Sequence, residues 1–219
     1  GGLIAERGLL ERVRRWQQRH PNDLSTLNIS LFSYPNPALS ELLTAWSEGE
    51  RRVLCQVPQG LIVANIANIL GRPLVAGDQI TEGKLTIKII PFTNQKNYDY
   101  LLWSSHINFV RGEDSFVRAQ WAQRPFVWHI YPQQEGAHRV KLEAFLTRYC
   151  AALAPEVSQS VRALFDGWNN HTQAVGAAWR NFEAHLPTLI PHAQHWAHHL
   201  LHHRDLVFHL VQQVEKQLK

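Results

Sequence analysis

The sequence predicts an α/β fold in which a Rossmann-like parallel sheet is followed by a helical C-terminal segment. Runs with the spacing of strands and of helices alternate, with short connections, through residues 1–155. After Pro155 the apolar residues follow helical spacing only. The 219 residues are 45% hydrophobic and 18% charged, which is typical of a globular chain with one large domain or two small ones.

Strands are predicted where short apolar runs stop at turn residues, as the β-branched run before Pro91 does. The predicted strands are Asn28–Ser33, Arg52–Val57, Leu85–Ile90, Ile107–Val110 and Phe126–His129. Helices are predicted where apolar residues recur every three or four positions, as at Leu9, Val13 and Trp16. The predicted helices are Leu9–Gln18, Ala38–Trp46, Leu61–Leu70, Asn97–Trp103, Ser115–Ala122 and Ala137–Tyr149.

The second part, residues 156–219, is expected to pack on the same domain as a helical appendage. Its predicted helices are Glu156–Trp168, Thr172–His185, His192–His203 and Arg204–Leu218. The chain contains no methionine, and position 1 is glycine. Because translation starts with methionine, we expect this chain to be part of a longer protein.

Several classes of protein are excluded by composition. No run approaches the roughly 18 apolar residues of a membrane-spanning helix, because Leu61–Leu70 is interrupted by Asn65 and Asn68. The N-terminal segment lacks the apolar core of a secretory signal. Two cysteines, Cys55 and Cys150, cannot form a disulfide framework, so we expect buried thiols in a cytoplasmic protein.

The segment with the clearest chemical character follows the predicted strand Ile107–Val110. Arg111 offers a planar cation suited to phosphate, and Gly112 permits a close approach of backbone or an unusual turn. Asp114 or Ser115 can cap the next helix, whose first amides form an anion site. Glu113 suits a ribose or sugar hydroxyl better than a phosphate. The alternative is that Arg111 simply pairs with Glu113 or Asp114.

Three other predicted strands end in residues of ligand-binding type. Phe32 and Tyr34 follow the first strand, Phe92 and Gln95 follow the third, and Tyr131 follows the last. Because ligands of an open parallel sheet bind at the carboxyl ends of its strands, these side chains are expected to share one rim. Aromatic rings there can stack on a base, and Gln95 can hydrogen-bond its edge. The alternative is that Phe32 and Phe92 are core residues.

A histidine-rich stretch lies in the predicted helix at 192–203. The histidines spaced three or four apart are His192, His195, His199 and His202. Such spacing can bind zinc or nickel, but no cysteine or carboxylate stands at a matching position. We therefore expect a solvent-facing helix and no metal site.

Four runs of the sequence resemble the same known family: GGLIAERGLL, LFSYPNPALSELLTAW, PFTNQKNYDYLLW and NFVRGEDSFVRAQWAQRPFVWHIYPQ. They closely resemble the C-terminal half of the EarP family, the protein-arginine rhamnosyltransferases that modify elongation factor P. The resemblance covers most of residues 1–150. It implies the C-terminal half of a GT-B glycosyltransferase, with dTDP-β-L-rhamnose as donor, one arginine of elongation factor P as acceptor, and inversion at the anomeric carbon.

The resemblance also implies roles for individual residues. The matched positions are Arg111, Glu113, Asp114 and Ser115 in the donor-contacting motif, Phe92 and Gln95 at the thymine, Phe32 and Tyr34 as aromatic contacts, and Tyr131 at the phosphates. Glu113 matches a residue important for activity on the donor side. The N-terminal GT-B domain, which supplies the proposed general base, is absent from the chain, so we expect donor binding with essentially no turnover.

The expected ligands and partners follow from the same resemblance. The expected ligand is dTDP-rhamnose or dTDP, and elongation factor P is expected to bind mainly to the absent domain. We expect the protein to be a monomer and to need no metal. Two alternatives of other classes remain: a non-catalytic module that binds a nucleotide or phosphate, and a nucleic-acid-binding domain suggested only by the sequence pI of about 9.3. We expect neither a nucleic acid nor a membrane as partner.

Overall fold

The computed structural model describes residues 8–21, 25–133, 136–170, 174–202, 211 and 214–215. Its sheet contains the strands β1 (Thr26–Leu31), β2 (Arg52–Pro58), β3 (Gln79–Glu82), β4 (Leu85–Ile90), β5 (Ile107–Arg111) and β6 (Phe126–His129). Its helices are α1 (Leu9–Arg19), α2 (Leu39–Glu48), α3 (Leu61–Leu70), α4 (Gln95–Ser104), α5 (Asp114–Trp121), α6 (Ala137–Tyr149), α7 (Pro155–Asn170), α8 (Val175–Ala184) and α9 (Leu186–His202).

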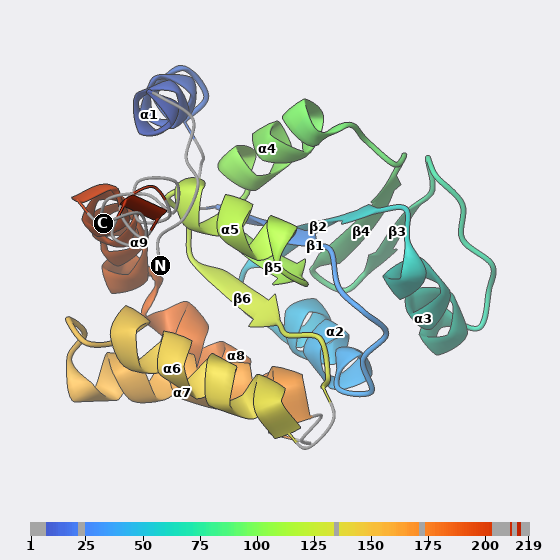
Figure 1. Ribbon diagram of the computed structural model, residues 1–219. Helices are drawn as coiled ribbons and strands as arrows, with labels where there is room; N and C mark the ends of the chain where they lie inside the picture. The colour runs from blue at the N-terminus through green and yellow to red at the C-terminus, as the bar shows by residue number, and fades with distance from the viewer. Residues whose placement is uncertain are drawn as a thin grey trace.

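The strands lie in the order β3-β4-β2-β1-β5-β6 (Figure 1). Every neighbouring pair is parallel except β3 and β4, which form an antiparallel hairpin at one edge. From β1 the chain moves outward in one direction through β2 and β4 and then returns to the other side for β5 and β6. The boundary between β1 and β5 is therefore the topological switch point, outside which open α/β sheets bind their ligands.

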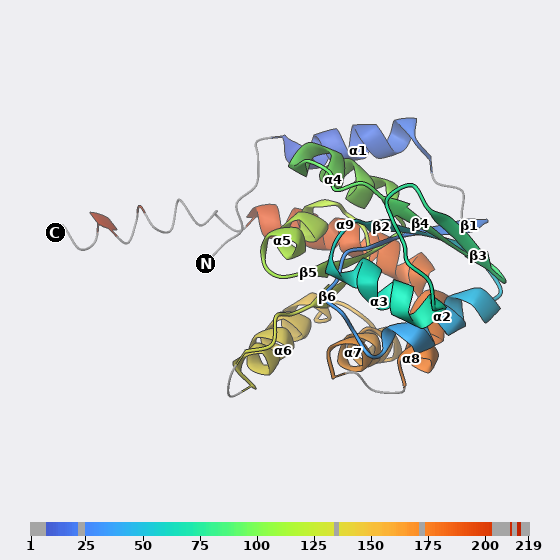
Figure 2. The same ribbon diagram turned by 90° about the vertical axis from the view of Figure 1, so that its right-hand side faces the viewer.

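Helices cover both faces of the sheet, as Figure 2 shows in side view. On one face lie α4 and α5, with α1 against α4 and α9 against α5. On the other face lie α2 and α3, and α8 packs on α2 while α7 packs on both α8 and β6. Because both faces are covered, β5 is buried along its whole length except at Arg111, its last residue.

The helices after Pro155 share one apolar core with the sheet. At its centre Phe109 of β5 packs edge-on against Trp46 of α2, at 5.7 Å between ring centroids, and Trp168 of α7, at 5.1 Å. Trp179 of α8 contacts Trp46 at 5.4 Å. A polar contact reinforces this junction, because Asn36 Nδ2 donates to the carbonyl of Trp168 at 2.8 Å.

The α/β fold class and the five predicted strands are confirmed, with small shifts at their ends. The prediction missed β3, because only Ile80 of its four residues is buried and no alternation marks it. It also started the last described helix at His192, whereas α9 begins at Leu186 and continues through Pro191. The predicted helix Arg204–Leu218 lies almost wholly outside the described residues. No helix among the described residues is long and apolar enough to cross a bilayer.

Candidate functional site

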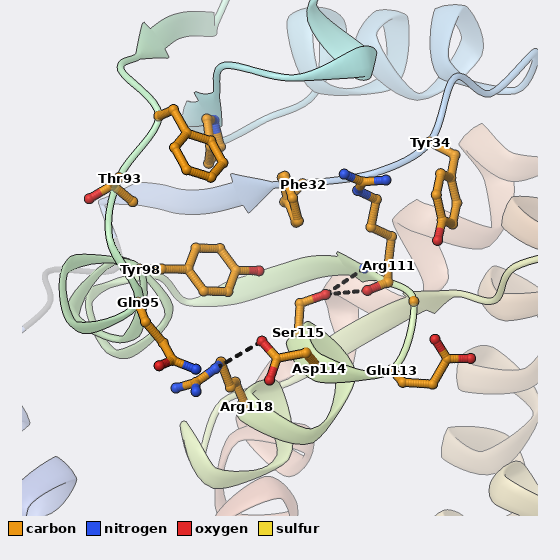
Figure 3. Close-up of a pocket in the computed structure, with 13 residues that line it drawn as sticks. Phe32, Tyr34, Thr93, Gln95, Tyr98, Arg111, Glu113, Asp114, Ser115 and Arg118 are labelled. Atoms are coloured by element: carbon orange, nitrogen blue, oxygen red, sulfur yellow. Dashed lines mark hydrogen bonds and ion pairs between the residues drawn. The ribbon is translucent and has the colours of Figure 1, made fainter.

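A cavity of about 490 Å³ opens at the carboxyl ends of the strands, beside the switch point between β1 and β5 (Figure 3). Its lining residues are Phe32, Tyr34, Pro58, Phe92, Thr93, Gln95, Tyr98, Arg111, Gly112, Glu113, Asp114, Ser115 and Arg118. The loops after β1, β4 and β5, the last residue of β2 and the helices α4 and α5 all contribute to it. Eight of the nine site residues predicted from sequence line this one cavity, and the ninth, Tyr131, lies just outside it.

The turn from β5 to α5 is held closed by its own hydrogen bonds. Ser115 Oγ accepts from the Arg111 amide at 3.1 Å and donates to the Arg111 carbonyl. Gly112 has φ 60°, a conformation that favours glycine, and its carbonyl accepts from Trp128 Nε1 at 2.7 Å. The prediction that Asp114 or Ser115 caps α5 is wrong, because Glu113 holds the N-cap position without a side-chain cap.

Arg111 lies between two aromatic rings. Its guanidinium carbon is 4.5 Å from the centroid of Phe32 and 4.7 Å from that of Tyr34. Its Nε is buried without a hydrogen-bond partner, and among the described residues no carboxylate pairs with it. The alternative in which Arg111 pairs with Glu113 or Asp114 is therefore wrong. A planar cation held by its faces keeps its N–H groups for a ligand.

A buried polar pair fixes the segment that carries Tyr34. Ser33 Oγ and His129 Nδ1 are 2.7 Å apart, and both residues are buried. The Tyr34 ring meets His129 edge-on at 5.3 Å, and its hydroxyl would lie 3.2 Å from a Cβ at Gly112. Tyr131 continues this row, with its ring 5.6 Å from Tyr34 and 57% of its surface exposed. Tyr131 thus lies on the outer rim next to the cavity.

The aromatic residues at the other end of the cavity differ in burial. Phe92 is 77% exposed, so the alternative that it is a core residue is wrong. Phe32 is partly buried and packs edge-on against Tyr98 at 5.6 Å. The Tyr98 hydroxyl points toward Ser115 and Arg111 (Figure 3). Burial raises the pKa of Tyr98, so this hydroxyl stays protonated and can donate a hydrogen bond.

Arg118 of α5 joins α4 to the cavity. Its Nη1 donates to both carboxylate oxygens of Asp99, at 2.9 and 3.0 Å, and its Nε donates to Asp114 at 3.1 Å. In the amide orientation that satisfies both side chains, Gln95 Oε1 accepts from Arg118 Nη2 and, at 3.1 Å, from Nε. The Asp114 side chain is 78% exposed, and its partner Arg118 is only 20% exposed.

Sequence reasoning missed Tyr98 and Arg118. A signal for each existed, because Tyr98 lies one helical turn after Gln95 and Arg118 lies four residues after Asp114. Glu113, by contrast, was predicted and lies exposed at the cavity, on the other side of the turn from Asp114 (Figure 3). The cavity thus combines aromatic faces, one unpaired guanidinium, the amides at the start of α5 and an exposed carboxylate.

The histidines of α9 point to structure more than to metal binding. His192 donates from Nε2 to the carbonyl of Tyr149 at 2.8 Å, and His195 donates from Nδ1 to that of Pro191 at 2.8 Å. The described residues hold no group of three or more histidine, cysteine or acidic side chains that could bind a metal ion. His202 ends α9, and its side chain lies outside the description. Cys55 and Cys150 are free and buried, as predicted.

Comparison with known proteins shows the family of this chain. The family model described as elongation factor P rhamnosyltransferase EarP matches residues 1–215. The chain belongs to this family. A protein-arginine rhamnosyltransferase of Pseudomonas aeruginosa is 42% identical over 97% of this chain and 60% of its own length. Relatives with the same name in Shewanella oneidensis and Neisseria meningitidis serogroup B are 39% and 32% identical, over 99% and 91% of this chain.

A solved structure agrees in fold as well as in sequence. It is described as the structural basis for EarP-mediated arginine glycosylation of translation elongation factor EF-P. It matches with a TM-score of 0.85 and 39% identity, covering 98% of this chain and 73% of the other. The chain spans about 60% of the length of the curated relatives from Pseudomonas and Shewanella. The shared fold of this solved structure agrees with the α/β fold class expected from the sequence.

Proposed function

We propose that this chain is the donor-binding part of a protein-arginine rhamnosyltransferase, which transfers L-rhamnose from dTDP-β-L-rhamnose to an arginine of elongation factor P. The observation that carries the proposal is the cavity at the switch point, where Phe32 and Tyr34 clamp Arg111 and no carboxylate of the described residues pairs with it. Membership of the EarP family supports the same reaction. An acceptor that acts in translation and two buried free cysteines are consistent with a cytoplasmic enzyme.

The diphosphate is proposed to lie against the turn from β5 to α5. Arg111 supplies a fixed cation, and the first amides of α5 supply donors at the positive end of the helix. Tyr131, on the outer rim, can reach the phosphates with its hydroxyl. Ser115 already donates its proton to the Arg111 carbonyl, so its first task is to hold the turn, and it contacts phosphate only if that bond opens.

The base is proposed to lie at the other end of the cavity, where Phe92 offers an exposed ring and Gln95 a polar edge. Glu113 and Asp114 both line the cavity, and a carboxylate there can accept hydrogen bonds from ribose or rhamnose hydroxyls. Positive charge at Arg111 and the helix amides can stabilise the leaving diphosphate without a metal ion.

Catalysis needs one more group. The arginine of the acceptor is protonated at neutral pH, so a carboxylate must orient its guanidinium and remove a proton as the nitrogen attacks. Glu113 is proposed as a donor-side residue that assists, and no residue of this chain is assigned as the general base. We therefore propose that this chain alone binds dTDP-rhamnose as a monomer and transfers essentially no sugar.

Calorimetric titration with dTDP, UDP and a short DNA duplex tests this proposal. We expect dTDP to bind severalfold more tightly than UDP, because an aromatic wall can contact the thymine methyl group. Phe92→Ala and Arg111→Ala should both weaken dTDP binding. Equal affinity for UDP would favour a general nucleotide-binding module, and duplex binding that survives both substitutions would favour a nucleic-acid-binding domain. Transfer onto elongation factor P is then assayed after the chain is joined to the N-terminal part of a relative.

A further inference from the structure

The orientation of the Gln95 amide is set by Arg118, which lines the same cavity. Arg118 of α5 lies next to Gln95 and faces its amide with Nη2 and Nε (Figure 3). A guanidinium carries five N–H donors and no acceptor. The only group that Gln95 can turn toward it is therefore the amide oxygen, and its NH₂ group must face elsewhere.

Arg118 is itself held firmly. Asp99 accepts two hydrogen bonds from Nη1, and Asp114 accepts one from Nε. Only 20% of the Arg118 side chain is exposed, so water competes little for these bonds. Because the guanidinium is planar and carboxylates hold its Nη1 and Nε, it cannot rotate away from Gln95 without breaking charge-assisted bonds.

The orientation of the Gln95 amide affects which pyrimidine base it can bind. Thymine and uracil carry a carbonyl acceptor at position 4, where cytosine carries an amino donor. An amide that could turn over freely would serve either base equally. An amide whose oxygen is bound to Arg118 can offer only its NH₂ group, which matches the carbonyl and repels the amino group.

We propose that Arg118 is a positioning residue that fixes Gln95 as a hydrogen-bond donor and thereby selects pyrimidines with a carbonyl at position 4 over cytosine. This inference rests on the proposed function, in which the base lies against Phe92 and Gln95. Gln95 is exposed, so water competes for its bond to the base. The expected preference is for that reason about tenfold.

The test compares dUDP with dCDP, because both lack the thymine methyl group and differ at position 4 in the way that matters here. Isothermal titration gives the ratio of the two dissociation constants for the 219-residue chain. We expect dUDP to bind about tenfold more tightly. Gln95→Glu leaves only carboxylate acceptors against the base, so the ratio should fall to one or reverse.

Arg118→Gln provides the second arm. Glutamine at 118 can donate or accept, so the Gln95 amide is free to turn over and the ratio should approach one. Arg162→Gln is the matched control, because Arg162 forms an ion pair with Glu143 at 2.7 Å on a distant surface, and it should keep the tenfold ratio. Circular dichroism checks that each variant is folded. If Arg118→Gln does not fold, Gln95→Glu still decides, because its side chain is exposed.

A ratio within twofold for the unsubstituted chain would overturn the inference, as would a tenfold ratio that persists in Gln95→Glu or in folded Arg118→Gln. These results leave the proposed function intact provided that dTDP binds and Arg111→Ala weakens it. If dTDP, dUDP and dCDP all fail to bind, the proposed function and the inference both fail.

Discussion

The clamped guanidinium of Arg111 leads to the sharpest prediction, which concerns Arg111→Ala and Arg111→Lys. A bidentate contact between arginine and a diphosphate contributes about 3 kcal/mol, as two charge-assisted hydrogen bonds. At about 1.4 kcal/mol for each factor of ten, its loss weakens dTDP binding about 100-fold. Lysine keeps the charge but loses the fork and the stacking between Phe32 and Tyr34, so Arg111→Lys should weaken binding about tenfold.

The effect on folding should be much smaller than the effect on binding. The two cation–π contacts stabilise the fold by about 1–2 kcal/mol together, but the buried Nε has no hydrogen-bond partner and costs free energy in return. We therefore expect the free energy of unfolding to change by about 1 kcal/mol or less. Calorimetric titration with dTDP and urea unfolding measure the two quantities. Affinity within twofold of the unsubstituted chain in Arg111→Ala would refute this account of the site.

Three further predictions concern the turn, the core and the response to pH. Gly112→Ala places a Cβ at φ 60° beside the Tyr34 hydroxyl, so it should lower the free energy of unfolding by about 1–2 kcal/mol and weaken dTDP binding. The control is Gly83→Ala, at φ 55° in the β3–β4 hairpin. It should also destabilise the fold but leave the ratio of dTDP to UDP affinity unchanged. Phe109→Ala should lower the free energy of unfolding by about 3–5 kcal/mol in urea titration, because Phe109 joins the sheet to α7; a loss under 1 kcal/mol would contradict that packing. Burial lowers the pKa of His192 below its usual 6.5, so the unfolded chain binds the proton more tightly than the folded chain does. The free energy of unfolding should therefore fall as the pH drops below 6.5. His192→Gln should reduce this pH dependence between pH 7.5 and 5.5, and an unchanged slope would mean that other groups cause the pH dependence.

Much of the fold follows from local patterns, and the failures have physical reasons. The parallel strands are recognisable because both of their faces are buried, which leaves near-continuous apolar runs such as that of β5. The edge strand β3 was not predicted because an edge strand buries few residues, in this case Ile80 alone. The helix predicted from His192 begins earlier, at Leu186, and continues through Pro191, since Leu189 and Ala193 on either side of the proline are buried in the helical layer.

For the site, the sequence predicts many of the residues but not how they are arranged. Residues such as Phe32, Phe92 and Arg111 could be predicted because they lie at or just after the carboxyl ends of strands, and parallel strands bring these ends to one edge of the sheet. The geometry could not be predicted. The clamp on Arg111 depends on how the loop after β1 returns past β5, and the network of Arg118 depends on how α4 packs on α5. Neither contact leaves a periodic trace in the sequence.

The distribution of charge around the cavity also bears on which ligand it suits. Arg118 is shared by Asp99 and Asp114, so it adds no net positive charge, whereas Arg111 has no carboxylate partner among the described residues. Glu113 stands exposed at the same turn. Inorganic phosphate would gain from Arg111 but would meet repulsion from Glu113. A nucleotide sugar can place its diphosphate at the guanidinium and its hydroxyls at the carboxylate, so it gains from both groups. The presence of Glu113 beside an unpaired arginine therefore favours a glycosyl donor over a simple phosphate.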